Sequence, residues 1–524
     1  MNDATHLARS TIRQLIELGV EDLVLSPGSR NAPLSIAAYQ AEQRGLIRLH
    51  VRIDERGAAF FALGLSKASN KYVPVICTSG TAVANYLPAV LEAYHSDIRL
   101  LVLTADRPAR LRKTGSNQTT LQAGIFGEFV RKRVDTAAPI DLAHLLDGAG
   151  PLHINLQFDE PLLSEDKSDW LGGIKHKEPN SPAHEEISIE VPTTRNLLIV
   201  GHDRAGFEVA AIEQLARDLG APLVVEDPLR FKDAIAHAPI ALSDERVRSE
   251  LAADLVVVIG RTTLSRSINS YINSSKQVVV IDPRAAHIDT ARSAAKVLHA
   301  LPRITNPVVR DEGWISKWRK FEGIAKQALV EFPPWSEGAV ASLIAADLEN
   351  DVALFIASSR PIRDLEGFAT PRALVTTYAN RGLAGIDGNI STALGMAARH
   401  DESVAILGDL AFLHDISALA NPTQDVLTLI VIDNNGGGIF STLPQRGVEG
   451  FEKLFGTPHH QDLAKICAGF GVSHEVVTSP KELHIALQRI HPTLHVIIAK
   501  VPSREANADA IAALLKRYRE LVTL

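Results

Sequence analysis

The stretch Val404–Phe440 constrains the fold of this chain most, because its pattern predicts a parallel βαβ unit. Two short, β-branched apolar runs, Val404–Leu407 and Val426–Ile432, flank one helix-sized segment. The first run ends at Asp409, and the second ends at the sequence DNNGGG. Right-handed crossovers bring the carboxyl ends of parallel strands to one edge of a sheet, where open α/β sheets bind ligands.

The side chains expected at this edge predict a divalent-metal site. Asp409 offers a carboxylate, Asn434 or Asn435 offers an amide oxygen, and the glycines at 436–438 offer backbone groups. Such an oxygen-only set suits Mg²⁺ holding a diphosphate, and glycines let the main chain approach phosphates closely. The same residues also serve as ordinary turns after buried strands, so the motif alone leaves both interpretations open.

Composition narrows the class of protein. A chain of 524 residues should hold about three domains, and 46% apolar and 22% charged residues are typical of a globular protein. The sequence has no apolar run of membrane-spanning length and no signal-peptide pattern, so we expect no membrane span. Cys77 and Cys467 have no CxxC partner, which favours a reducing, cytoplasmic location. A net charge of −7 argues against nucleic-acid binding.

Alternating helical and strand-like segments predict an α/β fold of three doubly wound parallel-sheet domains. The expected domains are residues 1–180, 190–330 and 335–524, with a polar, Pro-rich linker at 164–196 and a charged helical connector near 311–331. The expected strands are Leu23–Leu25, Leu49–Ile53, Val73–Cys77, Leu100–Leu103, His153–Leu156, Leu197–Val200, Leu223–Val225, Leu255–Ile259, Val278–Ile281, Leu354–Ala357 and Leu494–Ile498. The expected helices include Ala58–Ala68, Val83–Ala93 and Asn507–Leu524.

A Gly-Asp pair followed by Asn-Asn about 25 residues later resembles the diphosphate-binding motif of thiamine diphosphate enzymes. By that resemblance Asp409, Asn434 and the Gly436 carbonyl would ligate Mg²⁺, or Mn²⁺, which accepts the same oxygens. Asn435 is the alternative ligand, and Gly437 would lie beside the diphosphate.

Glu55, in IDERG, fits the glutamate that thiamine diphosphate enzymes place at an early strand end. There the carboxylate hydrogen-bonds the cofactor's aminopyrimidine ring and favours its imino tautomer. The alternative interpretation is an acid that merely stabilises a helix N-terminus.

Longer segments narrow the resemblance to one family of thiamine diphosphate enzymes. The segments SPGSRNAPL (26–34), DERGAAFFALGLSKAS (54–69), TSGTAVANYLPAVLEA (78–93), LTADRPARLRKTGSNQT (103–119), NRGLAGIDGNISTALG (380–395), GDLAFLHD (408–415) and DNNGGGIFSTLPQ (433–445) closely resemble the 2-succinyl-5-enolpyruvyl-6-hydroxy-3-cyclohexene-1-carboxylate synthases of menaquinone biosynthesis. The middle block resembles them weakly.

This resemblance implies a reaction that depends on thiamine diphosphate and Mg²⁺. The enzyme would decarboxylate 2-oxoglutarate and add the succinyl carbanion equivalent to isochorismate in a 1,4 sense. The alternatives are another thiamine-dependent 2-oxoacid decarboxylase or acetolactate-type lyase, or a catalytically silent binding protein on the same fold.

Both substrates carry two carboxylates, which arginine binds bidentately. The resemblance assigns one set to the isochorismate side: Ser29, Arg30, Arg107, Asn117 and Gln118. Ser359, Arg363 and Arg381 would lie near the 2-oxoglutarate carboxylates and the cofactor, and Ile386 would support the cofactor's bent shape. In the middle block Arg284, Arg292 and Lys296 are candidates, and Arg292 is preferred.

Glu55 and Asp409 fall in different expected domains. In thiamine diphosphate enzymes the two corresponding domains meet between subunits to form the active site. The resemblance therefore implies an obligate homodimer or a dimer of dimers.

Overall fold

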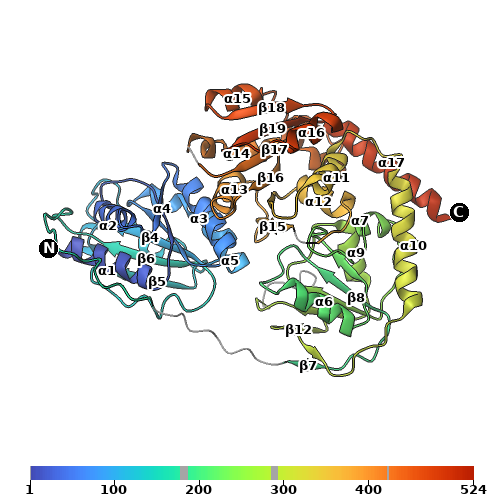
Figure 1. Ribbon diagram of the computed structural model, residues 1–524, viewed down its shortest axis with the longest axis horizontal. Helices are drawn as coiled ribbons and strands as arrows, with labels where there is room; N and C mark the ends of the chain where they lie inside the picture. Colours follow the sequence, from blue (N-terminus) through green and yellow to red (C-terminus); the bar gives the residue numbers. More distant parts are fainter. Residues whose placement is uncertain (1, 177–186, 285–292, 374, 422–423, 524) are drawn as a thin grey trace. The chain divides into compact units, whose positions relative to one another are not determined.

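The computed structural model describes residues 2–176, 187–284, 293–373, 375–421 and 424–523 (Figure 1). The chain divides into two compact units. The first unit comprises Met1–Ala183, Asp387–Asp401 and His414–Val426, and the second comprises His184–Ile386, Glu402–Leu413 and Leu427–Leu524. Two short pieces of the C-terminal third of the chain therefore belong to the same unit as the N-terminal third.

The first unit is built on a six-stranded parallel sheet with the strand order β2-β1-β3-β4-β6-β5. Its central strands are almost entirely buried and mostly apolar, as expected of a parallel sheet covered on both faces. The strands are β1 (Asp22–Leu25), β2 (Arg48–Val51), β3 (Val73–Cys77), β4 (Leu100–Asp106), β5 (Lys132–Thr136) and β6 (Leu152–Gln157). The helices are α1 (Asp3–Glu17), α2 (Ala32–Glu42), α3 (Glu55–Ser69), α4 (Thr81–Asn85) and α5 (Leu87–Ser96).

Helix α13 (Asn389–Ala397) packs against α3 with almost no space between the two backbones (Figure 1). A Cβ atom on Gly64 would lie 2.1 Å from the Thr392 carbonyl oxygen. A Cβ atom on Gly395 would lie 2.1 Å from the Phe61 carbonyl oxygen. Only glycine fits at either position, and this crossing fixes the helix that begins at Glu55.

The second unit contains two larger parallel sheets. The five-stranded sheet has the order β12-β11-β10-β8-β9, from β8 (Asn196–Val200), β9 (Leu223–Val225), β10 (Leu255–Ile259), β11 (Val278–Ile281) and β12 (Lys296–Leu298). A two-stranded sheet pairs β7 (Ser188–Ile189) with β13 (Arg303–Ile304). The accompanying helices are α6 (Val209–Asp218), α7 (Ala238–Ala241), α8 (Glu245–Glu250), α9 (Arg266–Ser274) and α10 (Glu312–Leu329).

The six-stranded sheet of this unit has the order β15-β14-β16-β17-β19-β18, and every pairing is parallel. Its strands are β14 (Ala353–Ile356), β15 (Thr376–Tyr378), β16 (Ser403–Gly408), β17 (Leu427–Asp433), β18 (Ser473–Val477) and β19 (His495–Lys500). Its helices are α11 (Glu337–Asp347), α12 (Arg360–Phe368), α14 (Asp409–His414), α15 (Leu463–Gly469), α16 (Pro480–Leu487) and α17 (Arg504–Thr523). The predicted adjacency of the strands around Val404 and Val426 is confirmed.

The structure differs from the sequence prediction in several places. The helix expected at Val83–Ala93 is divided at Tyr86 into α4 and α5, because Pro88 cannot continue the preceding helix. The helix expected between β16 and β17 is α14 followed by a 3₁₀ turn at Ile416–Ala420. Strands β5 and β18 escaped prediction because, as edge strands, they carry polar and partly exposed residues.

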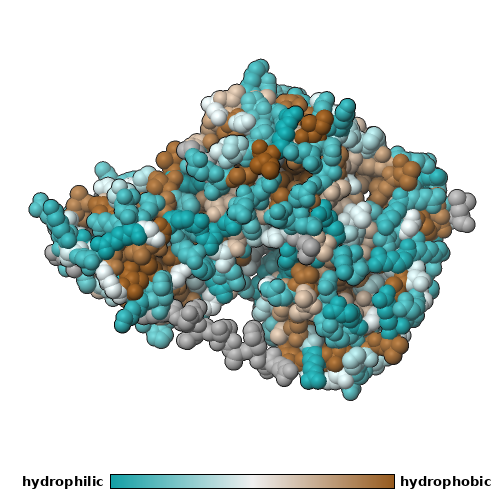
Figure 2. All heavy atoms as spheres, in the orientation of Figure 1, coloured by the Kyte–Doolittle hydropathy of each residue, from teal (hydrophilic) through white to brown (hydrophobic). Residues whose placement is uncertain are grey.

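Polar side chains cover most of the face seen in Figure 2, with apolar residues in scattered patches. Among the helices in the described ranges, none combines the length and apolarity needed to cross a bilayer.

Candidate functional site

Asp409 lies at the carboxyl end of β16 and is 2% exposed. Its Oδ1 accepts a hydrogen bond from the Leu410 backbone N–H at 2.6 Å, and its Oδ2 accepts one from the Gly436 N–H at 2.8 Å. The second bond ties the end of β16 to the loop that follows β17. The predicted convergence of these two strand ends is therefore present.

Asn434 and Asn435 use their side chains differently. The Asn434 amide nitrogen donates to Glu337 Oε1 at 2.5 Å, while its Oδ1 is buried and has no hydrogen-bond partner in the described part of the chain. Asn435 adopts a left-handed conformation (φ 63°), and its Oδ1 accepts from the His460 N–H at 2.9 Å. A buried acceptor without a donor is costly, so Asn434 Oδ1 is the atom left for a ligand.

The glycines of this loop are required by close contacts. A Cβ atom on Gly436 would lie 2.2 Å from the Gly456 carbonyl oxygen, and one on Gly438 would lie 2.3 Å from the Asn434 amide nitrogen. The Gly437 N–H donates to the Gly456 carbonyl at 2.8 Å. The Gly436 carbonyl accepts from the Gly438 N–H at 2.9 Å and keeps a second lone pair.

His459 adds an imidazole that the sequence analysis missed. Its Nε2 lies 3.3 Å from Asp409 Oδ2 and 3.6 Å from Asp433 Oδ1. The hydrogen bond to Asp409 raises the pKa of His459, and burial followed by the charge of Asp409 raises the pKa of Asp433. Ligand atoms of these three residues lie within 4.8 Å of one another. No spacing in the sequence relates position 459 to 409, so local pattern could not have found it.

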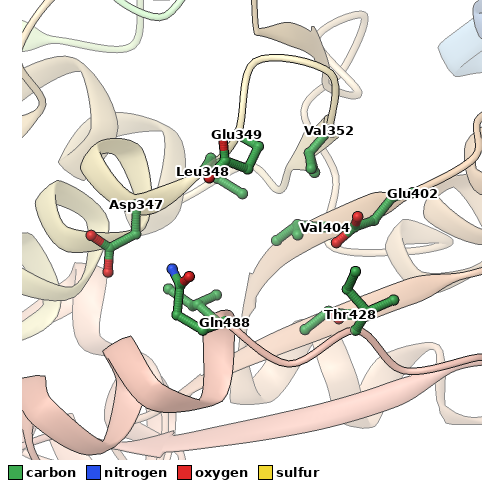
Figure 3. Close-up of a pocket in the computed structure, with 10 residues that line it drawn as sticks. Asp347, Leu348, Glu349, Val352, Glu402, Val404, Thr428 and Gln488 are labelled. Atoms are coloured by element: carbon green, nitrogen blue, oxygen red, sulfur yellow. The ribbon is translucent and has the colours of Figure 1, made fainter.

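A pocket of about 220 Å³ lies at the opposite ends of the same strands (Figure 3). It is lined by Val352, Glu402 and Thr428, where β14, β16 and β17 begin, together with Asp347 and Gln488. Ligands of open α/β sheets bind beyond the carboxyl ends of the strands. This pocket is therefore separate from the edge that carries Asp409.

Glu55 is the first residue of α3, after the N-cap Asp54, whose side chain accepts from the Arg56 N–H. Its carboxylate is partly exposed, and Oε2 accepts a bond of 3.3 Å from the Asn85 amide. The nearby Ile53 side chain is 72% exposed. The carboxylate thus has one weak partner and an apolar neighbour open to solvent.

The predicted arginines of the first unit lie at its carboxyl edge. Arg107 donates to Ser79 Oγ at 3.2 Å and to the Gln118 carbonyl at 3.1 Å. Arg30 donates to the Phe158 carbonyl at 3.0 Å, and its Nη1 lies 3.3 Å from a Glu160 carboxylate oxygen. Ser29, Asn117 and Gln118 are exposed at the surface.

The buried residue Gln122, which the sequence analysis missed, stabilises this edge of the sheet through hydrogen bonds. The buried Gln122 side chain accepts from the Gly80 N–H and donates to the Ala105 carbonyl and to Asn155. It thereby links the loops after β3 and β4.

The predicted arginines of the second unit lie in one cluster, in which Arg381 is buried and Arg363 is partly exposed. Arg363 donates to the Ser359 carbonyl at 2.6 Å, and Ser359 has a left-handed backbone (φ 73°) at the start of α12. Burial, followed by the charges of Arg360 and Arg381, lowers the pKa of Arg363 to about 10. The guanidinium of Arg363 is therefore short of compensating negative charge.

Arg381 is 2% exposed and pairs with Glu226, which follows β9 in the five-stranded sheet; Nη2 lies 2.9 Å from Oε1. Glu226 also accepts from the His202 and Leu264 N–H groups. Glu366 lies in the same cluster, and burial followed by the charge of Glu226 raises its pKa. Because Glu226 is about 155 residues from Arg381 in sequence, no motif predicted the pair.

The remaining predicted residues have separate surroundings. Ile386 is 41% exposed and lies at the boundary of the second unit's first segment. Arg284 is held by Asp203 and Asp282, with contacts of 2.6 Å to each. Lys296 is exposed in β12, and Arg292 lies outside the described residues.

The comparisons with protein families match three consecutive regions. Residues 5–125 match the N-terminal TPP-binding domain of thiamine pyrophosphate enzymes, and residues 363–499 match the C-terminal TPP-binding domain. Residues 164–356 match the middle domain of thiamine pyrophosphate enzymes.

Curated relatives are similar over nearly the whole chain. A 2-succinyl-5-enolpyruvyl-6-hydroxy-3-cyclohexene-1-carboxylate synthase of Nocardioides sp. is 39% identical over 95% of this chain and 95% of the relative. The synthase of the same name from Thermobifida fusca is 36% identical over 98% and 100%. Among solved structures, benzoylformate decarboxylase from Polynucleobacter necessarius superposes with a TM-score of 0.66 at 14% identity, covering 95% of this chain and 98% of that one. That likeness concerns the fold.

Proposed function

Because the chain belongs to the 2-succinyl-5-enolpyruvyl-6-hydroxy-3-cyclohexene-1-carboxylate synthase family of thiamine pyrophosphate enzymes, we propose specific roles for its two acidic centres. The protein is a thiamine-diphosphate-dependent enzyme. Asp409 and Asn434 hold a divalent metal and the cofactor's diphosphate. Glu55 accepts a hydrogen bond from the aminopyrimidine ring.

One observation carries the metal assignment: the buried Asn434 Oδ1 has no protein donor within the described residues, while the amide nitrogen of the same side chain donates to Glu337. A metal ion supplies the missing partner. Asn435 is the weaker candidate because the His460 N–H already occupies its oxygen. An oxygen of the Asp409 carboxylate and the second lone pair of the Gly436 carbonyl complete an all-oxygen set that suits Mg²⁺ or Mn²⁺.

Bound thiamine diphosphate supplies a centre that stabilises the carbanion left by loss of CO₂. Glu55 contributes by holding a proton at a ring nitrogen of the pyrimidine. Asn85 engages Oε2, which leaves Oε1 to accept that bond. The exposed apolar surface of Ile53 and Val51 beside it excludes water from the ring once the site is filled.

The substrates that we propose are 2-oxoglutarate and isochorismate, the second as the acceptor of the succinyl unit in menaquinone biosynthesis. The support is two groups of arginines, one for each dicarboxylate. Arg30 and Arg107, with Ser29, Asn117 and Gln118, face isochorismate. Arg363 and Arg381, with Ser359, bind 2-oxoglutarate, and the depressed pKa of Arg363 reflects a cation that gains stability from a carboxylate ligand.

We propose a homodimer or a dimer of dimers as the assembly, because each compact unit carries one half of the cofactor chemistry. Sedimentation of the protein with and without cofactor tests this. The domain limits 1–180, 190–330 and 335–524 remain predictions. A reducing compartment agrees with Cys77 and Cys467, which are both buried thiols.

The decisive experiment mixes the protein with thiamine diphosphate, Mg²⁺, 2-oxoglutarate and isochorismate. We expect isochorismate absorbance to fall in step with CO₂ release. CO₂ release that is unchanged without isochorismate would instead indicate a simple 2-oxoacid decarboxylase. Failure to bind thiamine diphosphate and Mg²⁺ in a calorimeter would indicate a catalytically silent protein.

A further inference from the structure

We propose that Glu475, His491 and His495 form a second metal site, selective for a zinc-like dication, at the edge of the six-stranded sheet in the second unit. Glu475 lies on the edge strand β18, His495 begins β19, and His491 lies in the connection between α16 and β19. None of these residues takes part in the proposed cofactor chemistry.

The three side chains converge closely. One ligand atom from each lies within 4.8 Å of the other two. The imidazole rings of His491 and His495 are stacked, with centroids 3.5 Å apart and planes 5° from parallel. His495 is 3% exposed, and the Nε2 atoms of both histidines are buried without a hydrogen-bond partner in the described ranges. Two buried imidazole nitrogens without a hydrogen bond, one of them facing the Glu475 carboxylate, therefore point to a missing ligand.

The orientation of His495 leaves Nε2 available for that ligand. Its Nδ1 lies 2.9 Å from Ser473 Oγ, on the residue that pairs with it across β18 and β19. Ser473 and Glu475 are two residues apart on one strand, so their side chains share a face of the sheet. A partner on the distal nitrogen that orients the ring is the usual support for a metal-bound histidine.

The local charges also favour a dication. Glu475 Oε1 lies 3.3 Å from His495 Nε2, which is ion-pair range but outside hydrogen-bond geometry. The other oxygen, Oε2, is engaged by the exposed Arg489 at 3.0 Å.

The donor set selects the class of metal. Two imidazole nitrogens and one carboxylate, with room for water in the fourth position, suit Zn²⁺ and neighbouring transition metals. Mg²⁺ prefers oxygen ligands and does not compete here. Binding at about 2.0–2.1 Å from each nitrogen requires the stacked rings to splay, which the partly exposed His491 can do by rotating. The bound ion would clip the edge strand to β19.

The test uses untagged protein saturated with thiamine diphosphate and Mg²⁺, so that neither an affinity tag nor the Asp409 site contributes. Titration with Zn²⁺ should show one tight equivalent, and Co²⁺ in its place should give visible absorption bands of a nitrogen-ligated ion. Thermal unfolding should shift upward when Zn²⁺ is added.

The variant His491→Ala should weaken Zn²⁺ binding about 100-fold or more and abolish the thermal shift, with turnover unchanged. Glu475→Gln should weaken binding less, since the two nitrogens remain. His474→Ala is the matched control, because His474 lies on the same strand but outside the group, and it should bind Zn²⁺ as the wild type does. No tight equivalent in the wild type, equal affinity in His491→Ala, or loss of binding in His474→Ala would each overturn the proposal.

Discussion

The two acidic centres of the molecule are built in opposite ways. Glu55 in the first unit is partly exposed and has one hydrogen bond of 3.3 Å. Asp409 in the second unit is buried, and two backbone N–H groups hold its two oxygens. A loosely held carboxylate is available for proton chemistry, whereas one held by the backbone fixes a loop and has a set position for binding a metal. Substitutions should therefore separate turnover from binding and folding.

The largest effect is expected for Glu55→Gln. A neutral amide no longer favours the imino tautomer of the pyrimidine, so turnover should fall by about 10²–10⁴-fold. Because Glu55 has few partners, cofactor affinity and the unfolding midpoint should stay near the wild-type values. Steady-state rates and a cofactor titration on the same preparation measure turnover and cofactor affinity. An unchanged rate would mean that Glu55 does not stabilise the imino tautomer.

Arg381→Ala should have the next largest effect, and it should act mainly on stability rather than on turnover. It leaves the buried Glu226 carboxylate without its cation, which should cost about 3–5 kcal/mol of unfolding free energy. The requirement for 2-oxoglutarate should also rise while thiamine diphosphate affinity is retained. Urea unfolding and KM measurements test this, with the double variant Arg381→Ala plus Glu226→Gln as the control that should recover stability. Loss of cofactor affinity alone would mean that Arg381 is misplaced.

Asp409→Ala should weaken Mg²⁺ and cofactor binding together. It also leaves the partly buried Leu410 N–H and the buried Gly436 N–H without acceptors, which should cost about 2–3 kcal/mol of stability. Calorimetric titration and urea unfolding should both change. If the variant instead loses turnover but keeps cofactor affinity and stability, Asp409 acts in the same way as Glu55, and the expected difference between the two centres is wrong.

Neighbouring asparagines sharpen the contrast within the second centre. Asn434→Ala should weaken metal-dependent cofactor binding about tenfold or more, because the unpartnered oxygen is lost. Asn435→Ala removes an oxygen that the His460 N–H already uses, so its effect on Mg²⁺ dependence should be smaller. The reverse order in a Mg²⁺ titration would assign the metal to Asn435.

The smallest effect concerns the pH dependence of stability in the first unit, which also carries Glu55. Asp415 accepts from the Ser391 N–H at 2.7 Å, and burial raises its pKa to about 6 from 3.8. The folded state therefore favours the protonated acid, a contribution present below pH 3.8 and lost as pH rises through 6. Asp415→Asn does not titrate, so its stability relative to the wild type should rise by about 2 kcal/mol between pH 4 and pH 7. Urea unfolding at several pH values measures the difference, and parallel curves would refute it.

The local sequence pattern predicted much of the fold, but few of the side-chain contacts between residues far apart in the chain. Strands such as Val73–Cys77 and Leu255–Ile259 were found because buried parallel strands are short apolar runs followed by polar residues. The approach of Asp409 to the loop after β17 followed from strand-end geometry. Glu226 and His459 were missed because their partners lie far away in sequence, and such pairings leave no periodic signal.

The glycine-to-glycine crossing of α3 and α13 also bears on how such a gene can change over time. Gly64 and Gly395 tolerate no side chain because each faces the other helix's backbone. A recombination event at any point between them would combine α3 from one ancestral gene with α13 from another. The two helix surfaces would then not have evolved to pack against each other. Helix α3 should therefore be inherited together with residues 389–397, even though more than 300 residues separate the two helices in the chain.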